Sequence, residues 1–331
     1  MSKNKELLTA SSMNTFLSCP RLYYLRYRAG GCGMKPLVCS DALAFGTAFH
    51  KIMEARANGV SLDELLPTKE GIATEADAKL WALAYGYQRC WSGANDIIAK
   101  MKPEIEFGPD PISGSRTFFS AGKIDGLAEL TDGRTALIEH KTTGEDISDG
   151  SEYWNRLSFN TQLYKYVLAL RAKGVAIDTV IYDVIRKPTI KQSAKETASE
   201  YAERILADAT GEGFGDNPKA KDYKRGAAFY FRRMEVTIPE GNLDEYRVQE
   251  RGVAHALVHY MAEEREAEHH PEYAWPRNCN GLVCKGCEFC GPCLNRSDVD
   301  QTVPWAGFRY AEKQNEELSV TAADKSAAMP E

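Results

Sequence analysis

The sequence lacks three features that would assign it to whole classes of proteins. No apolar run approaches the ~18–20 residues that a bilayer span requires. The first residues lack the ~7–15-residue apolar stretch of a secretory signal, so we expect a chain that stays in the cytoplasm. No G-x4-GK-[S/T] phosphate loop occurs, which argues against an ATP site.

Positive charge is also scarce overall. The chain has 41 basic and 47 acidic residues, a net charge of -6, which argues against a protein that coats nucleic acid over its whole surface. The first 35 residues are the exception, because six basic residues face Glu6 alone, a local +5. These residues are Lys3, Lys5, Arg21, Arg26, Arg28 and Lys35. A local patch at this end could contact phosphates.

The 331 residues are enough for one large domain or two modest ones, and 43% hydrophobic residues is typical of globular proteins. Helical spacing of apolar residues predicts helices at 11–28 (two pieces around Pro20), 41–58, 75–91, 159–172, 195–209 and 243–268. Alternation predicts strands at 104–107, 117–130, 135–141, 176–184 and 227–238, with a hairpin turn at 131–133. The mixture indicates an α/β fold.

We expect a single domain over residues 1–300. It would comprise a helical part (10–100), a core that contains the sheet (101–240), and a C-terminal helix with a cysteine cluster (241–300). Residues 301–331 are polar and acidic, and we expect them to be disordered.

Two strands of the predicted sheet carry charged residues close to the hairpin turn. Asp125 lies in one strand and Glu139 in the next, so the hairpin brings two carboxylates together. Lys141 lies two residues beyond Glu139 and therefore on the same face. Two carboxylates and an ammonium suit metal-assisted phosphodiester hydrolysis with Mg²⁺ or Mn²⁺. From spacing alone, a surface hairpin with an ion pair fits the same residues.

Near the C-terminus, five cysteines fall within fifteen residues, as Cys279-x4-Cys284-x2-Cys287-x2-Cys290-x2-Cys293. In a reducing cytoplasm such a cluster predicts a metal site, because thiolates select zinc or iron–sulfur clusters. A zinc site needs four of these five residues. The alternative is an iron–sulfur cluster that takes Cys19 as its first ligand.

The order of motifs resembles the PD-(D/E)XK nuclease superfamily, and within it the RecB-like branch. The resemblance depends on GKIDG (122–126), a turn, and IEHKTT (138–143), preceded by GTAFH (46–50) and followed by Gln162-x3-Tyr166. It covers about residues 10–295 and implies a restriction-endonuclease-like core, with a central mixed sheet flanked by helices. Gln162 and Tyr166 are four residues apart and share a helix face. Gly46, one turn before His50, would leave room for the imidazole.

The resemblance also implies roles for individual residues. The ligands of the catalytic cation would be His50, Asp125, Glu139 and the backbone carbonyl of His140. Lys141 would be the catalytic lysine, and Gln162 and Tyr166 would support the site and the substrate. The side chain of His140 should point to the opposite face of the sheet from Glu139. Glu106, on an earlier strand, is a weaker candidate for a metal ligand. The alternative is that its carboxylate is simply exposed to solvent on the strand.

Among these nucleases the sequence is most similar to the iron–sulfur members, which include AddB-type domains, CRISPR-adaptation exonucleases and phage relatives. They place one cysteine before the core and three after it, commonly as Cys-x2-Cys-x5-Cys. The resemblance therefore implies a [4Fe–4S] cluster held by Cys19, Cys284, Cys287 and Cys293, with Cys279 as the alternative to Cys284. Such a cluster would join the two ends of the chain, at an entropic cost that grows only slowly with loop length.

The sequence thus predicts a metal-dependent DNA exonuclease of a bacterial cell, encoded by the bacterium or by a phage. With no ATP site, unwinding of a duplex would come from a helicase or recombination protein as partner. The alternative is a DNA-binding or assembly module without enzymatic activity, which carries a structural zinc or iron–sulfur site.

Overall fold

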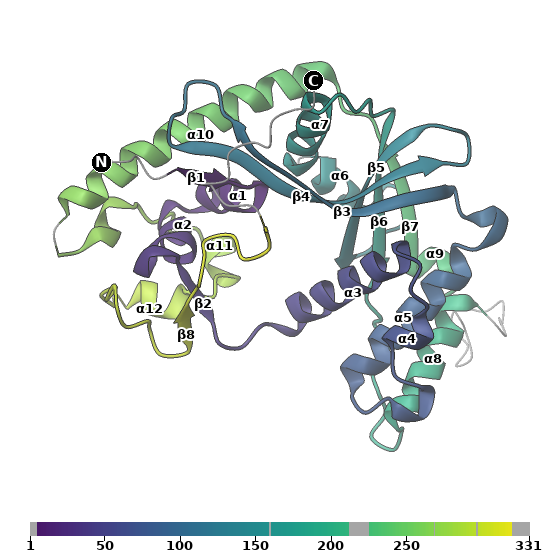
Figure 1. Cartoon of the computed structure of the whole chain (residues 1–331). Coiled ribbons are helices and arrows are strands. Elements are labelled where there is room, and N and C mark those ends of the chain that lie inside the picture. Colours follow the sequence, from purple (N-terminus) through teal and green to yellow (C-terminus); the bar gives the residue numbers. More distant parts are fainter. Residues whose placement is uncertain (1–4, 159, 212–224, 268, 296, 320–331) are drawn as a thin grey trace.

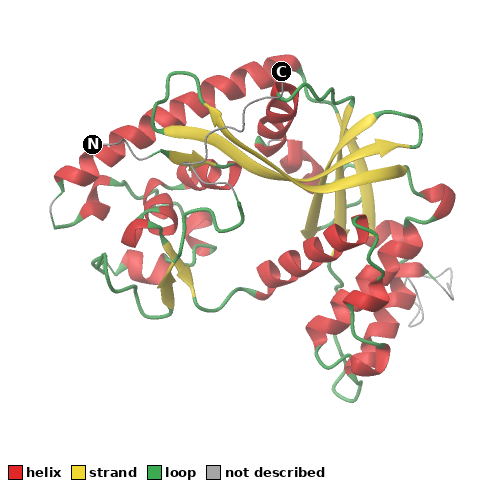
Figure 2. Cartoon of the chain, viewed as in Figure 1, coloured by secondary structure: helices red, strands yellow, loops and turns green. Residues whose placement is uncertain are grey.

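The computed structural model describes residues 5–158, 160–211, 225–267, 269–295 and 297–319. A six-stranded mixed sheet flanked by helices lies at its centre (Figure 2), and the predicted α/β fold is confirmed. The strand order is β1-β4-β5-β6-β7, with β3 on the opposite edge of β4. The strands are β1 (Glu6–Leu8), β3 (Ile98–Pro111), β4 (Phe118–Leu130), β5 (Thr135–Thr143), β6 (Thr179–Arg186) and β7 (Phe231–Val236).

One edge of β4 has two different partners. Near its start, β1 lies parallel to β4 at Phe118–Ser120, whereas β5 pairs antiparallel with β4 only at 126–129. Residues 121–125 of β4 therefore lie between these two partners. The predicted hairpin turn joins β4 to β5, and Gly133 there has the positive φ of +87° that glycine adopts without strain. Beyond β5 the sheet continues with parallel β6 and antiparallel β7.

Helices cover both faces of the sheet. On one face, α6 (Glu152–Ser158) and α7 (Gln162–Ala172) pack against apolar residues of β4, β5 and β6. On the other face a helical layer packs near β6 and β7. It consists of α3 (Asp41–Ala57), α4 (Leu62–Leu65), α5 (Glu75–Cys90), α8 (Ala198–Thr210) and α9 (Ala227–Tyr230). Capping boxes at Thr74 and Thr197 satisfy the first amides of α5 and α8 and so define where these helices begin.

Elements from the N-terminal part and from the C-terminal part of the described chain lie side by side in what we call the terminal module (Figure 1). Its N-terminal elements are α1 (Ala10–Ser18), α2 (Pro20–Tyr27) and β2 (Met34–Pro36). Its C-terminal elements are α10 (Glu240–Glu266), η4 (Pro271–Ala274), α11 (Gly281–Lys285), α12 (Cys290–Leu294) and β8 (Phe308–Tyr310). Trp275, with no exposed surface, stacks on Tyr23 of α2, so the two ends share one core. None of the described helices is long and apolar enough to cross a membrane.

Two predicted elements differ in the structure. The helix expected at 159–172 is present as α7 but begins three residues later, where the side chain of Asn160 accepts the amide of Gln162, and the separate helix α6 before it was not predicted. The strand expected at 227–238 begins only at Phe231, because Ala227–Tyr230 form α9. Tyr230 is fully buried against α5 and α8, and this tertiary packing overrides the local β propensity. The sequence also favours a loop at 211–226, most of which lies outside the described residues.

The expectation of disorder from residue 301 is wrong for residues 301–319. β8 pairs antiparallel with β2, and the ring of Phe308 stacks on that of the fully buried Phe289 at 4.9 Å. The segment is polar on average, but its aromatic residues at 305, 308 and 310 supply the apolar surface that an ordered segment needs. Residues 320–331 lie outside the described part of the chain.

We expect Phe308→Ala to lower the free energy of unfolding by about 2 kcal/mol, below the ~3–5 kcal/mol typical of a fully buried Phe. Val303→Ala is the matched control, since Val303 lies in the same segment with 61% of its surface exposed and should change little. Urea unfolding followed by circular dichroism measures both. Equal stability of the two variants would mean that this segment does not pack on Phe289.

Candidate functional site

The predicted carboxylates meet where β4 and β5 part. The last residue pair between the two strands is Gly126 with Ile138, and Asp125 and Glu139 are the next residues outward on each strand. The amide of His140 is free of the β4–β5 ladder here and donates instead to Asp125 Oδ2 at 2.9 Å. The carboxylate thus takes the place of a backbone carbonyl as acceptor. This hydrogen bond fixes its position where β4 and β5 part.

His50 reaches the same place from α3. Its Nδ1 lies 3.6 Å from Asp125 Oδ1. Burial alone would raise the pKa of Asp125, but the hydrogen bond and charge of His50 outweigh it and lower that pKa. Burial alone would lower the pKa of His50, but the hydrogen bond and charge of Asp125 outweigh burial and raise that pKa. The two groups therefore favour each other's charged forms.

Gly46 serves a different contact from the one predicted. A Cβ atom at this position would meet Thr142 Oγ1 of β5 at 3.3 Å, a tight contact, and the imidazole of His50 is not among the atoms nearby. The glycine therefore lets α3 approach β5, and this approach in turn brings His50 to Asp125.

Glu139 and Lys141 face α7 on one side of the sheet, as the two-residue period predicted. Lys141 Nζ donates to Glu139 Oε1 at 2.5 Å and to Gln162 Oε1 at 3.2 Å, and Gln162 Nε2 donates to the hydroxyl of Tyr166 at 2.6 Å. All four residues thus form one chain of hydrogen bonds.

Glu139 is only 1% exposed, and its Oε2 has no hydrogen-bond partner among the described residues. Burial raises the pKa of Glu139 to about 6, against the opposing effect of the Lys141 charge. The pKa of Lys141 is raised, since Glu139 outweighs the effect of burial. A buried carboxylate oxygen without a donor is costly unless a cation compensates it. Together with Asp125, this oxygen fits a divalent cation with hard oxygen ligands such as Mg²⁺ or Mn²⁺.

The side chain of His140 lies on the opposite face, as predicted. Its Nδ1 is 3.3 Å from Asp183 Oδ2 on β6, and its ring meets that of His50 edge to face at 6.1 Å. Asp183 has no exposed surface and also contacts Tyr87 and Arg233. Burial would raise the pKa of Asp183, but Arg233 and His140 lower it. Sequence reasoning did not single out Asp183, although a lone acid in an otherwise apolar strand is a signal for such a partner.

Other charged residues of the sequence have structural partners. The Glu106 carboxylate accepts from the amide of Ser319 at 3.0 Å. In the basic N-terminal segment, Arg28 pairs with Glu6 and Glu264, and Arg26 pairs with Glu288. Arg21 is buried, and its Nε donates to the carbonyl of Trp275 at 2.9 Å. These contacts join α2 to other elements of the terminal module, so each of the three arginines has a partner within the protein.

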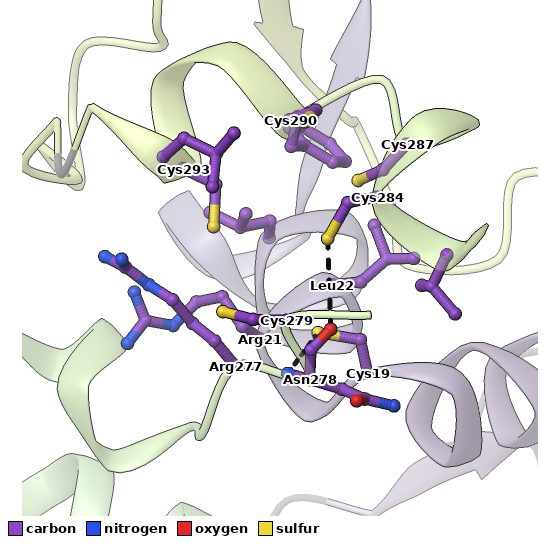
Figure 3. Close-up of a pocket in the computed structure, with 14 residues that line it drawn as sticks. Cys19, Arg21, Leu22, Arg277, Asn278, Cys279, Cys284, Cys287, Cys290 and Cys293 are labelled. Carbon is purple, nitrogen blue, oxygen red and sulfur yellow. Dashed lines mark hydrogen bonds between the residues drawn. The ribbon is translucent and has the colours of Figure 1, made fainter. Parts of the chain in front are cut away.

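The C-terminal cysteines line one pocket together with Cys19, which lies between α1 and α2 (Figure 3). The amide of Asn278 donates to Cys19 Sγ at 3.4 Å, and Cys284 Sγ donates to the carbonyl of the same residue at 3.9 Å. Burial raises the pKa of Cys287 to about 11 and also raises that of Cys293. These thiols are therefore neutral without a metal, and a metal would bind in exchange for protons. The soft sulfur donors fit zinc or an iron–sulfur cluster.

Two carboxylates and a lysine where two strands of a mixed α/β sheet part are suited to metal-assisted phosphodiester hydrolysis, the chemistry of nucleases. A model of the PD-(D/E)XK nuclease superfamily matches residues 7–293. The chain belongs to this superfamily, whose members generally use a divalent metal ion.

Two solved structures show a weak overall likeness. A phage-related exonuclease from Haemophilus somnus 129PT is 12% identical over 78% of this chain and 97% of its own, with a TM-score of 0.31. The protein SSO0001 is 13% identical over 62% of this chain and 78% of its own, with a TM-score of 0.26. No curated protein matches the sequence.

We expect Arg233→Met to lower the stability by about 3–5 kcal/mol at pH 7, because it leaves the buried Asp183 carboxylate without its cation. In the variant, the pKa of Asp183 in the folded state lies above its value in the unfolded state. The difference in stability between variant and wild type should therefore become smaller as the pH falls towards 4. Urea unfolding of the wild type and the variant between pH 4 and 7 measures this difference in stability.

Arg232→Met is the matched control for this prediction. Arg232 precedes Arg233 on β7 but pairs with Asp149, whose side chain is 83% exposed. Such a surface pair contributes about 0–1 kcal/mol. The role given to Asp183 would be contradicted if Arg232→Met lost as much stability as Arg233→Met. It would also be contradicted if the stability lost in Arg233→Met did not change with pH.

Proposed function

We propose that this chain is a metal-dependent DNA exonuclease whose site comprises His50, Asp125, Glu139, the carbonyl of His140, Lys141, Gln162 and Tyr166. The observation that carries the proposal is the buried, unpartnered Glu139 Oε2 beside Asp125, at the parting of β4 and β5. The oxygen that Lys141 leaves without a donor is available to a cation, and a second carboxylate, that of Asp125, lies at the same place. The RecB-like resemblance adds the exonuclease mode of action and the DNA substrate.

In this mechanism His50, Asp125, Glu139 and the His140 carbonyl would hold Mg²⁺ or Mn²⁺, which supplies Lewis-acid polarisation of the phosphate and an acidified water. His50 keeps Asp125 ionised, since it lowers the pKa of that carboxyl. Lys141 stays charged because Glu139 raises its pKa, so its ammonium can orient the attacking water or stabilise charge on the phosphate.

Gln162 and Tyr166 act as positioning residues for this lysine. The carbonyl oxygen of Gln162 accepts a hydrogen bond from the Lys141 ammonium, while its amide NH2 donates to the hydroxyl of Tyr166. Tyr166 stays neutral, because burial raises its pKa well above the ordinary value. The pair thereby restricts the rotamers of Lys141 near Glu139, which reduces the entropic cost of orienting the ammonium.

We also propose a [4Fe–4S] cluster in the cysteine pocket, with Cys19, Cys287, Cys293 and either Cys284 or Cys279 as ligands. Its support is that α2 brings Cys19 to the C-terminal cysteines across more than 250 residues, whereas a zinc site could form from the C-terminal five alone. Arg21 and Arg277 line the same pocket and would offset the negative charge of the thiolates.

We also propose a partner protein and a cellular compartment for this activity. With no phosphate loop in the sequence, a helicase or recombination protein would unwind duplex substrates for the nuclease. The cytoplasm of a bacterial cell is the expected compartment, for either a bacterial or a phage gene.

Asp125→Asn and Lys141→Met should each reduce Mn²⁺-dependent cleavage of end-labelled linear DNA by at least about 10²-fold, the usual cost of losing an electrostatic group of the site. Anaerobically purified protein is assayed with and without Mn²⁺ on single- and double-stranded DNA. Closed circular DNA of the same sequence should persist if cleavage starts from an end.

Asp132→Asn is the control, because Asp132 is an exposed acid in the same hairpin and its partner is Arg134. The Asp132→Asn variant should cleave DNA at the same rate as the wild type. DNA binding without any cleavage by folded wild type would refute the nuclease and support the non-enzymatic binding module instead.

Cys19→Ser should lose the iron of anaerobically purified protein and the broad visible absorption of a cluster. Cys39→Ser should keep both, because Cys39 is exposed and lies outside the pocket. Comparing Cys279→Ser with Cys284→Ser identifies the fourth ligand by which variant loses iron. Zinc in place of iron, bound independently of Cys19, would contradict the cluster.

A further inference from the structure

A third group of metal-ligating side chains lies in the terminal module, apart from the two sites above. His270 and Glu272 lie at η4, and Asp298 follows α12. One ligand atom from each of the three lies within 4.8 Å of the others. His270 Nδ1 is 3.4 Å from Glu272 Oε1 and 3.6 Å from Asp298 Oδ1. None of the three lines the cysteine pocket.

Glu272 distinguishes this group from an ordinary surface cluster. It is only 2% exposed, and neither of its carboxylate oxygens has a hydrogen-bond partner among the described residues. Arg21 is also buried and its charge interacts with that of Glu272, but its Nε donates to the carbonyl of Trp275 and no salt bridge joins the two side chains in the described part of the chain. Burying a carboxylate without donors is costly, so this position calls for a cation.

We propose that His270, Glu272 and Asp298 bind a zinc ion. Around tetrahedral zinc, nitrogen and oxygen ligands at about 2.0–2.1 Å lie roughly 3.4 Å from one another, which matches the two measured separations. A histidine with two carboxylates favours zinc over Mg²⁺, which prefers all-oxygen octahedral sites. The side chains of His270 and Asp298 are 41% and 73% exposed, so a water can fill the fourth position.

The ion has a structural role at this place. The carbonyl of Asp298 accepts the indole N–H of Trp305 at 2.7 Å, and Trp275 follows η4 directly. Zinc would therefore join the segment after the cysteine helices to η4 and stabilise the packing of the C-terminal residues on α2. It would do so whether or not the protein is a nuclease.

The alternative for the same geometry is a protonated His270 that pairs with both carboxylates and needs no ion. The two arrangements differ in what they bind, because a protonated imidazole has no lone pair for a metal. Metal content therefore separates them directly.

The test is equilibrium dialysis of full-length, iron-loaded protein against Zn²⁺, with bound zinc measured per chain. Asp298→Asn and His270→Ala should each bind one zinc fewer than the wild type, and their melting temperature should no longer rise with added zinc. Co²⁺ gives a second readout: the variants should lose visible bands of nitrogen and oxygen ligation while any thiolate-to-cobalt charge-transfer band stays.

His259→Ala is the matched control, since His259 forms an exposed pair with Glu263 on α10 at 3.9 Å and lacks a buried carboxylate. It should bind as much zinc as the wild type. Zinc binding unchanged in Asp298→Asn and His270→Ala would overturn the proposal in favour of the protonated histidine. Because Asp298 is exposed, its variant should fold, and circular dichroism without zinc checks this.

Discussion

The candidate site depends on one hydrogen bond, from the amide of His140 to the carboxylate of Asp125. If β4 and β5 stayed paired to their ends, that amide would bond to a backbone carbonyl, and Asp125 would be an ordinary acid of a strand. Because the pairing stops at Gly126 and Ile138, the carboxylate takes the place of the missing acceptor. The interruption of the ladder thus both frees the amide of His140 and orients the acid that accepts from it.

Both faces of the sheet contribute to this arrangement. On one face α7 holds Lys141 through Gln162, and on the other Asp183 and Arg233 form a buried ion pair beneath His140. Asp183 contacts the side chain of His140, and His140 is the residue whose amide orients Asp125. Burial of charge is tolerated here because each group has an opposite charge or a donor close by.

Local patterns were enough to predict the central residues of the site. Asp125, Glu139 and Lys141 lie within one hairpin, where a two-residue period and a turn determine which side chains meet. The partners that the sequence did not reveal come from elements distant along the chain. Asp183 meets Arg233 only through the pairing of β6 with β7, and Arg28 meets Glu264 across 236 residues. The order of residues 301–319 depends likewise on β2 and Phe289, so the average polarity of that segment was misleading.

The joining of the two chain ends has a consequence for biosynthesis. Residues 10–27 leave the ribosome long before α10, Trp275 and Phe289, against which they bury their apolar side chains. During translation the N-terminal helices are therefore exposed without these partners, while the strands of the sheet can already pair. Contacts across so many residues are slow to form, so the terminal module completes its folding only after its C-terminal elements have been synthesised. Cys19, which is translated early, meets the other cysteines at that final stage.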